Sequence, residues 1–206
     1  MNLVFATRNE NKIREIQNLV GPSVRLLSLS DIGFHEIIEE PYHTFEENAR
    51  CKAQLIYTRC GVNCFADDSG LEVDALQGAP GVLSSRYADE ESPFLNEQDR
   101  YDANIRKILK SLEGVKDRKA RFRTVIVLII QGKEFVFEGV ADGWIINEPR
   151  GKEGFGYDPV FQPKGYSRSF AEMSLREKNR ISHRAKAFRQ LAAFLANEQN
   201  YSRFLL

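Results

Sequence analysis

The most regular feature of the sequence is an apolar run at residues 121–130, where polar and apolar positions first alternate and the last six positions are all apolar. A continuous run rich in β-branched residues is typical of a strand covered on both faces, so we expect this strand at the centre of a sheet. Gln131-Gly132 follows and predicts a hairpin into a second apolar stretch that reaches Ile146. Shorter apolar runs at residues 3–6 and 24–29 predict two further strands.

Four other segments repeat apolar residues at helical spacing. One helix is expected to begin after Thr44, which forms a capping box with Glu47, and to end at Gly61. A second capping box at Ser174 opens the helical C-terminal region. The apolar stripes of the four segments are Ile13, Ile16, Leu19 and Val20; Phe45, Ala49, Ala53 and Ile56; Tyr101, Ile105, Ile108 and Leu112; and Phe188, Leu191, Ala192 and Leu195. Strands interspersed with helices predict an α/β fold.

Residues 65–74 place four carboxylates within ten positions. We interpret Phe65-Ala66 as the end of a buried strand and Ser69-Gly70 as a turn, so Asp67 and Asp68 are expected where the strand runs into a loop. Because side chains alternate along a strand, one of the two should face a cleft while the other holds loop amides. Carboxylates in this position favour a site for Mg2+. The alternative is an acidic turn that merely caps the strand.

The polar segment at residues 7–12 connects a predicted strand to a predicted helix. Free N–H groups at a helix N-terminus can bind phosphate, and Lys12 adds a positive charge. The segment lacks the glycines of a P-loop, so an ordinary capped loop explains it equally well. Lys52 lies about two turns into the helix after Thr44 and could reach a cleft, although a solvated lysine is the commoner case.

Residues 149–159 combine glycines, aromatic residues and charges. A loop of this composition is typical of ligand binding, because glycine lets the backbone approach a ligand and an aromatic ring can stack on it. Further on, Lys178, His183 and Arg184 precede the last apolar stripe. They could face an anion, whereas a solvated helix face is the simpler explanation of the other charges nearby.

Composition limits the classes of partner. The chain has 206 residues, is 42% hydrophobic and has formal net charge +0, so we expect one domain without the basic surface of a nucleic-acid-binding protein. It shows no basic leader and no run of eighteen apolar residues, which predicts a soluble, cytoplasmic protein without a membrane partner. Three cysteines, Cys51, Cys60 and Cys64, lack C-x-x-C spacing, so reduced thiols are expected.

Six motifs follow one another between Asn2 and about Leu195. They are Thr7-x-Asn9-x-x-Lys12, Thr44-Phe45-x-Glu47-Asn48-Ala49-x-x-Lys52-Ala53, Ala66-Asp67-Asp68-Ser69-Gly70-Leu71, Gly78-Ala79-Pro80-Gly81-Val82, Gly154-Phe155-Gly156-Tyr157-Asp158-Pro159 and Ile181-Ser182-His183-Arg184. Together they resemble the inosine triphosphate pyrophosphatase family, whose members remove non-standard purine nucleotides.

The resemblance implies a fold and an activity. It implies that residues 1–206 form a single domain with a long, twisted mixed sheet, flanking helices, two lobes and an active-site cleft between them. It also implies a homodimer. The implied reaction is the Mg2+-dependent hydrolysis of purine nucleoside triphosphates such as ITP, dITP and XTP to the monophosphate and pyrophosphate.

The resemblance also implies roles for individual residues. Asp68 is implied as the catalytic base and, with Glu40, as a metal ligand. Lys12 and Lys52, together with the metal, would neutralise the triphosphate. Residues implied to bind the triphosphate or the rest of the nucleotide are Thr7, Arg8, Asn9, Glu10, Asn11, Lys12, Ser69, Phe155, Gly156, Tyr157, Asp158, Lys178, His183 and Arg184.

Hypoxanthine and xanthine carry an acceptor oxygen at position 6 where adenine carries a donor amine, so donors such as Lys178, His183 and Arg184 would select them.

Two positions depart from the family pattern: Arg8 replaces a small residue, and Pro41-Tyr42-His43 replaces a more flexible link. The competing hypotheses are a nucleotide-binding module that does not hydrolyse its ligand and a phosphatase acting on other phosphorylated metabolites.

Overall fold

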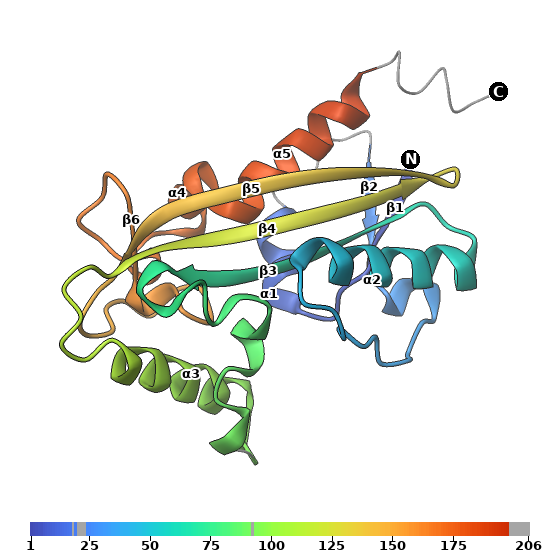
Figure 1. Ribbon diagram of the computed structural model, residues 1–206. Coiled ribbons are helices and arrows are strands. Elements are labelled where there is room, and N and C mark those ends of the chain that lie inside the picture. The colour runs from blue at the N-terminus through green and yellow to red at the C-terminus, as the bar shows by residue number, and fades with distance from the viewer. Residues whose placement is uncertain (18, 20–23, 92, 198–206) are drawn as a thin grey trace. The chain divides into compact units, whose positions relative to one another are not determined.

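The computed structural model describes residues 1–17, 19, 24–91 and 93–197 (Figure 1). It divides the chain into two compact units, which we describe separately. Unit 1 comprises Met1–Asp68, Thr124–Gly139 and His183–Leu206, and unit 2 comprises Ser69–Arg123 and Val140–Ser182. The strands are β1 Asn2–Phe5, β2 Arg25–Leu27, β3 Cys64–Val73, β4 Lys119–Ile130, β5 Lys133–Ile145 and β6 Phe161–Pro163. The α-helices are α1 Glu10–Gln17, α2 Phe45–Cys60, α3 Glu97–Ser111, α4 Leu175–Ile181 and α5 His183–Ala196.

The six strands form one mixed sheet in the order β2-β1-β3-β4-β5-β6. β1 runs parallel to both β2 and β3, whereas β5 and β6 are antiparallel. β4 lies between β3 and β5, and its last seven residues are all buried, as the apolar run predicted. The hairpin at Gln131-Gly132 is also confirmed. The short strand β6 was not predicted from the sequence.

Unit 1 covers its part of the sheet with helices on both faces. Along β3, Phe65 packs into a cluster with α1 and α5, whereas Cys64 and Ala66 pack into a second cluster with α2. β1 shows the same alternation, since Phe5 stacks on Phe65 with ring centroids 4.4 Å apart. Each strand in the middle of unit 1 therefore presents odd and even positions to different helices.

Unit 2 has its own apolar core. α3 buries Ile105, Ile108 and Leu112 of its predicted stripe against Phe122 of β4 and Phe161 of β6. The helix begins after Asn96, whose side chain accepts the N–H of Asp99 at 3.0 Å. The helix predicted from the stripe Tyr101, Ile105, Ile108 and Leu112 is thus confirmed, with an asparagine cap.

The prediction for residues 65–74 was wrong in one respect. β3 continues from Cys64 to Val73 without a turn at Ser69-Gly70, so Asp67 and Asp68 lie inside a strand rather than at its end. The alternation of side chains still holds, and the two carboxylates point to opposite faces of the sheet. Glu72 lies in unit 2, where it pairs with Arg121 and Arg123 on β4. The neighbouring strand β4 provides hydrogen-bond partners for the backbone of β3, and this pairing overrides the local preference of Ser69-Gly70 for a turn.

The C-terminal region is helical from Ser174, as predicted. It consists of two helices, α4 and α5, because Ser182 takes an extended backbone conformation between them. The capping box at Ser174 is confirmed. At Thr44 only half of the predicted box forms: Thr44 accepts the N–H of Glu47, and its hydroxyl donates to the Glu47 carboxylate. Val20, predicted at the end of the first stripe, lies outside the described residues.

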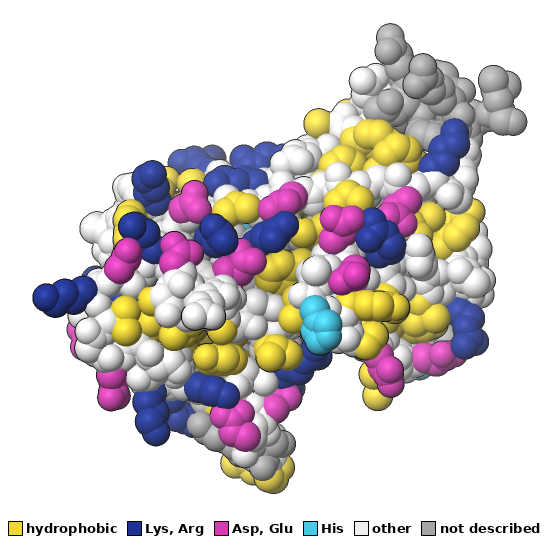
Figure 2. Space-filling model, in the orientation of Figure 1, with side chains coloured by type: hydrophobic (Ala, Val, Ile, Leu, Met, Phe, Trp, Pro, Cys, Tyr) yellow, Lys and Arg dark blue, Asp and Glu magenta, His cyan; other side chains and the backbone are white. Residues whose placement is uncertain are grey.

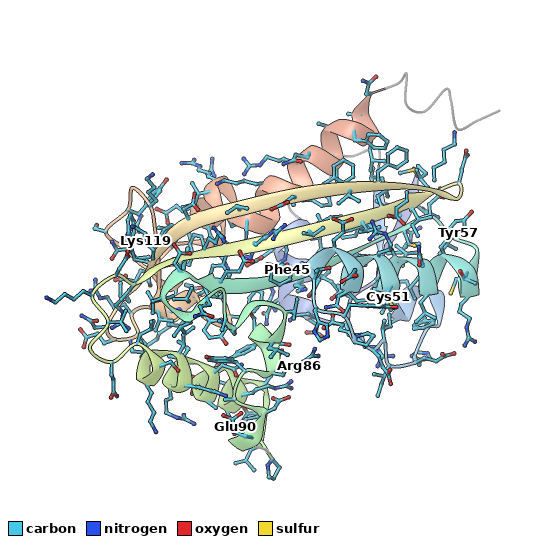
Figure 3. All side chains as sticks on the ribbon, viewed as in Figure 1. Phe45, Cys51, Tyr57, Arg86, Glu90 and Lys119 are labelled. Carbon is cyan, nitrogen blue, oxygen red and sulfur yellow. The ribbon has the colours of Figure 1, made fainter. Side chains whose placement is uncertain are left out.

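Surface features agree with the balanced composition. On the face seen in Figure 2, acidic and basic side chains of the described residues are interspersed. Within that part of the chain, no helix is long and apolar enough to cross a bilayer. Cys51, labelled on α2 in Figure 3, is a free thiol, as are Cys60 and Cys64.

Gly139 marks a close approach of strand and helix in unit 1. A Cβ placed on Gly139 of β5 would lie 2.1 Å from the carbonyl oxygen of His183 and 2.6 Å from the backbone nitrogen of Ala187. Both atoms belong to the backbone of α5 and cannot rotate away. The glycine therefore sets how closely α5 packs on β5.

We expect Gly139→Ala to lower the free energy of unfolding by about 3 kcal/mol, because α5 must shift to admit the methyl group. Urea denaturation measures the change. Val136→Ala, on an exposed position of the same strand, is the control and should cost well under half as much. Equal losses in the two variants would contradict the role given to Gly139.

Candidate active site

Asp67 of β3 is the centre of a buried charge network in unit 1. Lys12 Nζ, from α1, lies 3.0 Å from Asp67 Oδ1, and Arg184 Nε, from α5, lies 3.3 Å from Asp67 Oδ2. Arg184 Nη1 also pairs with Glu15, which is buried one turn beyond Lys12 on α1. A carboxylate stays charged in such a site only when cations meet it, and here α1 and α5 supply them.

Asp68 occupies the opposite face and meets α2. Lys52 Nζ lies 3.9 Å from Asp68 Oδ1 and also pairs with Glu40, whose segment precedes α2. Asn48 Nδ2 donates to Asp68 Oδ2 at 3.1 Å. Lys52, which was predicted to reach a cleft, is thus buried and paired, and it does not lie on the solvated face of its helix.

The two aspartates differ in the direction of their pKa shifts. Burial raises the pKa of Asp68, Lys52 opposes this, and repulsion from Glu40 adds to it, so the net shift is upward. For Asp67, burial acts in the same direction but Lys12 and Arg184 outweigh it, and the pKa falls. The more basic carboxylate is therefore Asp68, which suits it better to accept a proton.

The pKa values of the two neighbouring lysines are shifted as well. Burial lowers the pKa of Lys12, and its neighbours Lys52 and Arg184 add to the effect, although Asp67 opposes it. Burial acts in the same way on Lys52, but Asp68 and Glu40 outweigh it and raise its pKa. Lys52 is accordingly the more firmly charged of the two lysines.

Glu40 and Asp68, at the Lys52 end of this network, are the carboxylates that could hold a divalent cation. Glu40 and Asp68 both converge on one ammonium group, and the network as a whole brings four carboxylates (Glu15, Glu40, Asp67, Asp68) to three cations (Lys12, Lys52, Arg184). Among the described residues, no group of three or more acidic, histidine or cysteine side chains has the arrangement of a complete metal site. Mg2+ needs no more than one or two carboxylates when water and substrate phosphates complete its shell, so the donor set is compatible with it.

The segment at residues 7–12 forms the turn into α1. Asn9 Oδ1 accepts the N–H of Lys12 at 3.1 Å, and Thr7 Oγ1 accepts the N–H of Asn9 at 3.2 Å. Glu10 and Asn11 belong to the first turn of the helix, which starts earlier than the sequence analysis placed it. Arg8 is exposed, and its Nη2 donates to the carbonyl of Glu36 at 2.6 Å.

In unit 2, Phe155 lies in the glycine-rich loop and is fixed by its neighbours. Asp158 Oδ2 accepts the N–H of Phe155 at 2.9 Å and pairs with Lys178 Nζ, which lies 5.1 Å from the centre of the Phe155 ring. Gly154 is required here, because a Cβ would lie 2.0 Å from the same carboxylate oxygen. Tyr157 is buried, and its hydroxyl donates to the Ser84 carbonyl at 2.9 Å.

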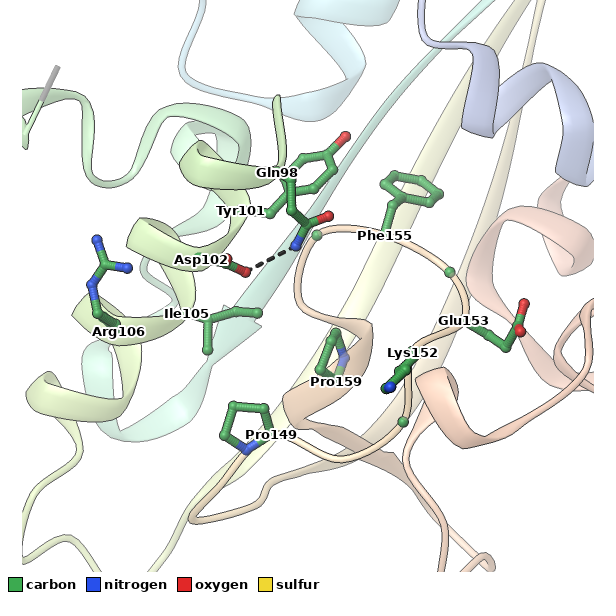
Figure 4. A pocket seen from close by; sticks show the side chains of 13 residues that line it. Gln98, Tyr101, Asp102, Ile105, Arg106, Pro149, Lys152, Glu153, Phe155 and Pro159 are labelled. Atoms are coloured by element: carbon green, nitrogen blue, oxygen red, sulfur yellow. Dashed lines mark hydrogen bonds between the residues drawn. The ribbon is translucent and has the colours of Figure 1, made fainter. Parts of the chain in front are cut away.

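The loop borders a pocket of about 450 Å³ in unit 2 (Figure 4). α3 contributes one wall with Tyr101 and Ile105, and the loop contributes the other with Pro149, Phe155 and Pro159. The Tyr101 and Phe155 rings are in tilted contact, with centroids 6.2 Å apart. The lining also includes the charged residues Asp102, Arg106, Lys152 and Glu153, and an aromatic ring beside such a pocket can hold the face of a planar ligand.

The predicted site residues fall into both units. Thr7 to Lys12, Glu40, Lys52, Asp68, His183 and Arg184 belong to unit 1, and Ser69, Phe155 to Asp158 and Lys178 belong to unit 2. Arg184 is held by two carboxylates, a setting the sequence did not reveal. Sequence reasoning also missed Glu15 and gave no role to Asn48. The spacing of Lys12 and Glu15 on one helical face could have suggested the first.

Known proteins resemble this chain over nearly its whole length. The sequence profile of the Ham1 family matches residues 3–194. A dITP/XTP pyrophosphatase from Christiangramia forsetii is 52% identical over 196 residues, which cover 95% of this chain and 100% of that protein. The dITP/XTP pyrophosphatase of Bacillus subtilis is 44% identical, with 93% of this chain and 96% of that protein covered.

Solved structures agree with the fold. The Ham1 protein of Staphylococcus aureus superimposes with a TM-score of 0.84 and is 36% identical, covering 96% of this chain and all of that one. A HAM1 protein from Coxiella burnetii gives a TM-score of 0.83 at 38% identity, covering 95% of this chain and 98% of that one. These matches confirm both the α/β fold with a mixed sheet and the resemblance of the six motifs. The chain belongs to the Ham1 family.

Proposed function

We propose that this protein hydrolyses the triphosphates of deaminated purines, dITP, ITP and XTP, to the monophosphate and pyrophosphate. Family membership and near-full-length similarity to dITP/XTP pyrophosphatases support the reaction class. The observation that carries the chemistry is the network in unit 1, where the adjacent carboxylates of Asp67 and Asp68 each meet a lysine. Such a network can bind a polyanion and accept a proton in one place.

The cations of unit 1 act on the phosphates. Lys12 stands in the first turn of α1, where helix N–H groups and its ammonium attract the same anion. Lys52 is positively charged and buried, so its charge acts in a medium of low dielectric constant and is weakly screened. We assign the triphosphate to Thr7 to Lys12 and to Lys52.

Glu40 and Asp68 would hold the metal ion. When bound, Mg2+ neutralises phosphate charge and makes coordinated water more acidic. Asp68 would take the proton from the attacking water, because its raised pKa makes it the better acceptor of the two aspartates. Asp67 instead keeps Lys12 and Arg184 in place.

Recognition of the base is assigned to one aromatic ring and three hydrogen-bond donors. We assign the face of the purine to the Phe155 ring, supported by the loop residues Gly156 to Asp158. Lys178, His183 and Arg184 are proposed to donate to the oxygen at position 6, as the family resemblance implies. Ser69 is proposed as a further nucleotide contact. A homodimer and a cytoplasmic location are proposed from the family resemblance and the sequence analysis, respectively.

An assay of pyrophosphate release tests the function. We expect dITP, ITP and XTP to be hydrolysed at least about tenfold more efficiently than GTP and ATP, with loss of activity when Mg2+ is removed by a chelator. Equal turnover of all purine triphosphates would contradict the selectivity. Binding of XTP without release of pyrophosphate would instead support a nucleotide-binding module, and release of inorganic phosphate would support a general phosphatase.

Asp68→Asn should lower kcat by at least about 1000-fold while the fold stays intact, because the amide neither accepts the proton nor neutralises the metal. The assay and circular dichroism measure the two effects. Asp142→Asn, an exposed aspartate of unit 2, is the control and should retain full activity. A near-normal kcat in Asp68→Asn would remove Asp68 from the mechanism.

Two variants separate stacking from base selection. Phe155→Ala should weaken hydrolysis of ITP and ATP together, since every purine has a face to stack. Arg184→Ala should weaken ITP hydrolysis more, compressing the ITP:ATP ratio of kcat/KM roughly tenfold. If Arg184→Ala leaves that ratio unchanged, Arg184 acts through Asp67 and Glu15 and the base is read by other donors.

A further inference from the structure

Asn48 is a fully buried polar side chain in the first turn of α2, with 0% of its surface exposed. Its Oδ1 accepts the N–H of Tyr42 at 3.0 Å, and its Nδ2 donates to the Tyr42 carbonyl at 3.1 Å. The same Nδ2 donates to Asp68 Oδ2 at 3.1 Å. One amide thus joins a strand, a helix and the segment that precedes the helix, all within unit 1.

We propose that Asn48 is a positioning residue, which fixes the carboxylate of Asp68 and the segment carrying Glu40 for the reaction proposed above. Both hydrogens of its amide group are engaged, one by Tyr42 and one by Asp68. The amide cannot rotate to release Asp68 without also breaking its two bonds to Tyr42. The orientation of the Asp68 side chain is therefore tied to the path of the backbone at Tyr42.

The backbone at Tyr42 in turn determines where Glu40 lies. Glu40 is two residues before Tyr42, and its carboxylate pairs with Lys52, one helical turn beyond Asn48 on α2. Lys52 therefore pairs with both acids directly, whereas Asn48 bonds to Asp68 directly and reaches Glu40 only through the backbone at Tyr42. Asn48 sets their direction through hydrogen bonds, while Lys52 balances their charge.

A role in packing alone would not need this side chain. Apart from Lys52, which pairs with Glu40 and Asp68, the other buried positions of α2 are apolar. A buried amide in such a place is costly unless all its bonds are made, and those bonds lead to one predicted catalytic residue and to the segment of one predicted metal ligand. The polar group thus lies where the reaction needs fixed geometry.

The test compares Asn48→Ala with the matched control Asn63→Ala. Asn63 Oδ1 accepts the N–H of Gln131 at 2.9 Å, so both variants release one backbone N–H in unit 1, but no bond from Asn63 to a carboxylate is involved. We expect Asn48→Ala to lower kcat for XTP by about 10- to 100-fold with KM within about threefold, and to raise the Mg2+ concentration that gives half-maximal rate. Asn63→Ala should change neither.

Hydrogen exchange provides a measurement that needs neither metal nor substrate. The Tyr42 N–H should exchange at least about tenfold faster in Asn48→Ala, and the Gln131 N–H should do so in Asn63→Ala. Asn48→Asp keeps the volume and can still accept the Tyr42 N–H, but when ionised it cannot donate to Asp68 and instead repels it. We expect kcat to fall in Asn48→Asp at least as far as in Asn48→Ala, while circular dichroism stays that of the wild type.

Two results would overturn the proposal: a wild-type kcat in either Asn48 variant, or an equal fall of kcat in Asn63→Ala. A wild-type protein that releases no pyrophosphate from XTP would refute the proposed function instead. In that case the exchange rate of the Tyr42 N–H still decides whether Asn48 holds the segment that carries Glu40.

Discussion

Two consecutive carboxylates on a buried strand can both stay charged only if cations meet each of them on its own face of the sheet. In unit 1 this requirement is met for Asp67 by α1 and α5, and for Asp68 by α2. The helices that cover the sheet are therefore also the source of its charge balance. Because the pKa of Asp67 falls and that of Asp68 rises, the same strand supplies two carboxylates of different basicity, and Asp68 is the better proton acceptor.

Packing and chemistry depend on the same alternation of side chains. The odd positions of β3 continue from the Phe65 cluster to Asp67, and the even positions continue from Ala66 to Asp68. Apolar contacts fix the position of the strand, which then fixes the carboxylates without any flexible connection. This explains why a polar network with four acids can persist in a buried place: the surrounding apolar clusters hold its members at the distances that the ion pairs require.

Much of this architecture could be predicted from the sequence, because it depends on local patterns. The apolar run in β4, the cap at Thr44 and the glycine-rich loop each carry their signal within a few residues. The path of β3 through Ser69-Gly70 could not be predicted, since strand pairing with distant segments overrides the local turn preference. The partners of Arg184 were hidden for a similar reason: Glu15 is 169 positions away in the sequence.

The two faces of β3 differ so much that the length of the strand matters as much as its composition. Deleting one residue between Cys64 and Ala66 would move every later side chain to the other face. Asp67, which meets Lys12, would then turn toward α2, and Asp68 would turn toward α1 and α5. A substitution on this strand changes one side chain, whereas a change in its length would exchange the roles of the two aspartates. Natural variation in this family should therefore avoid insertions and deletions here and place them in the surface loops.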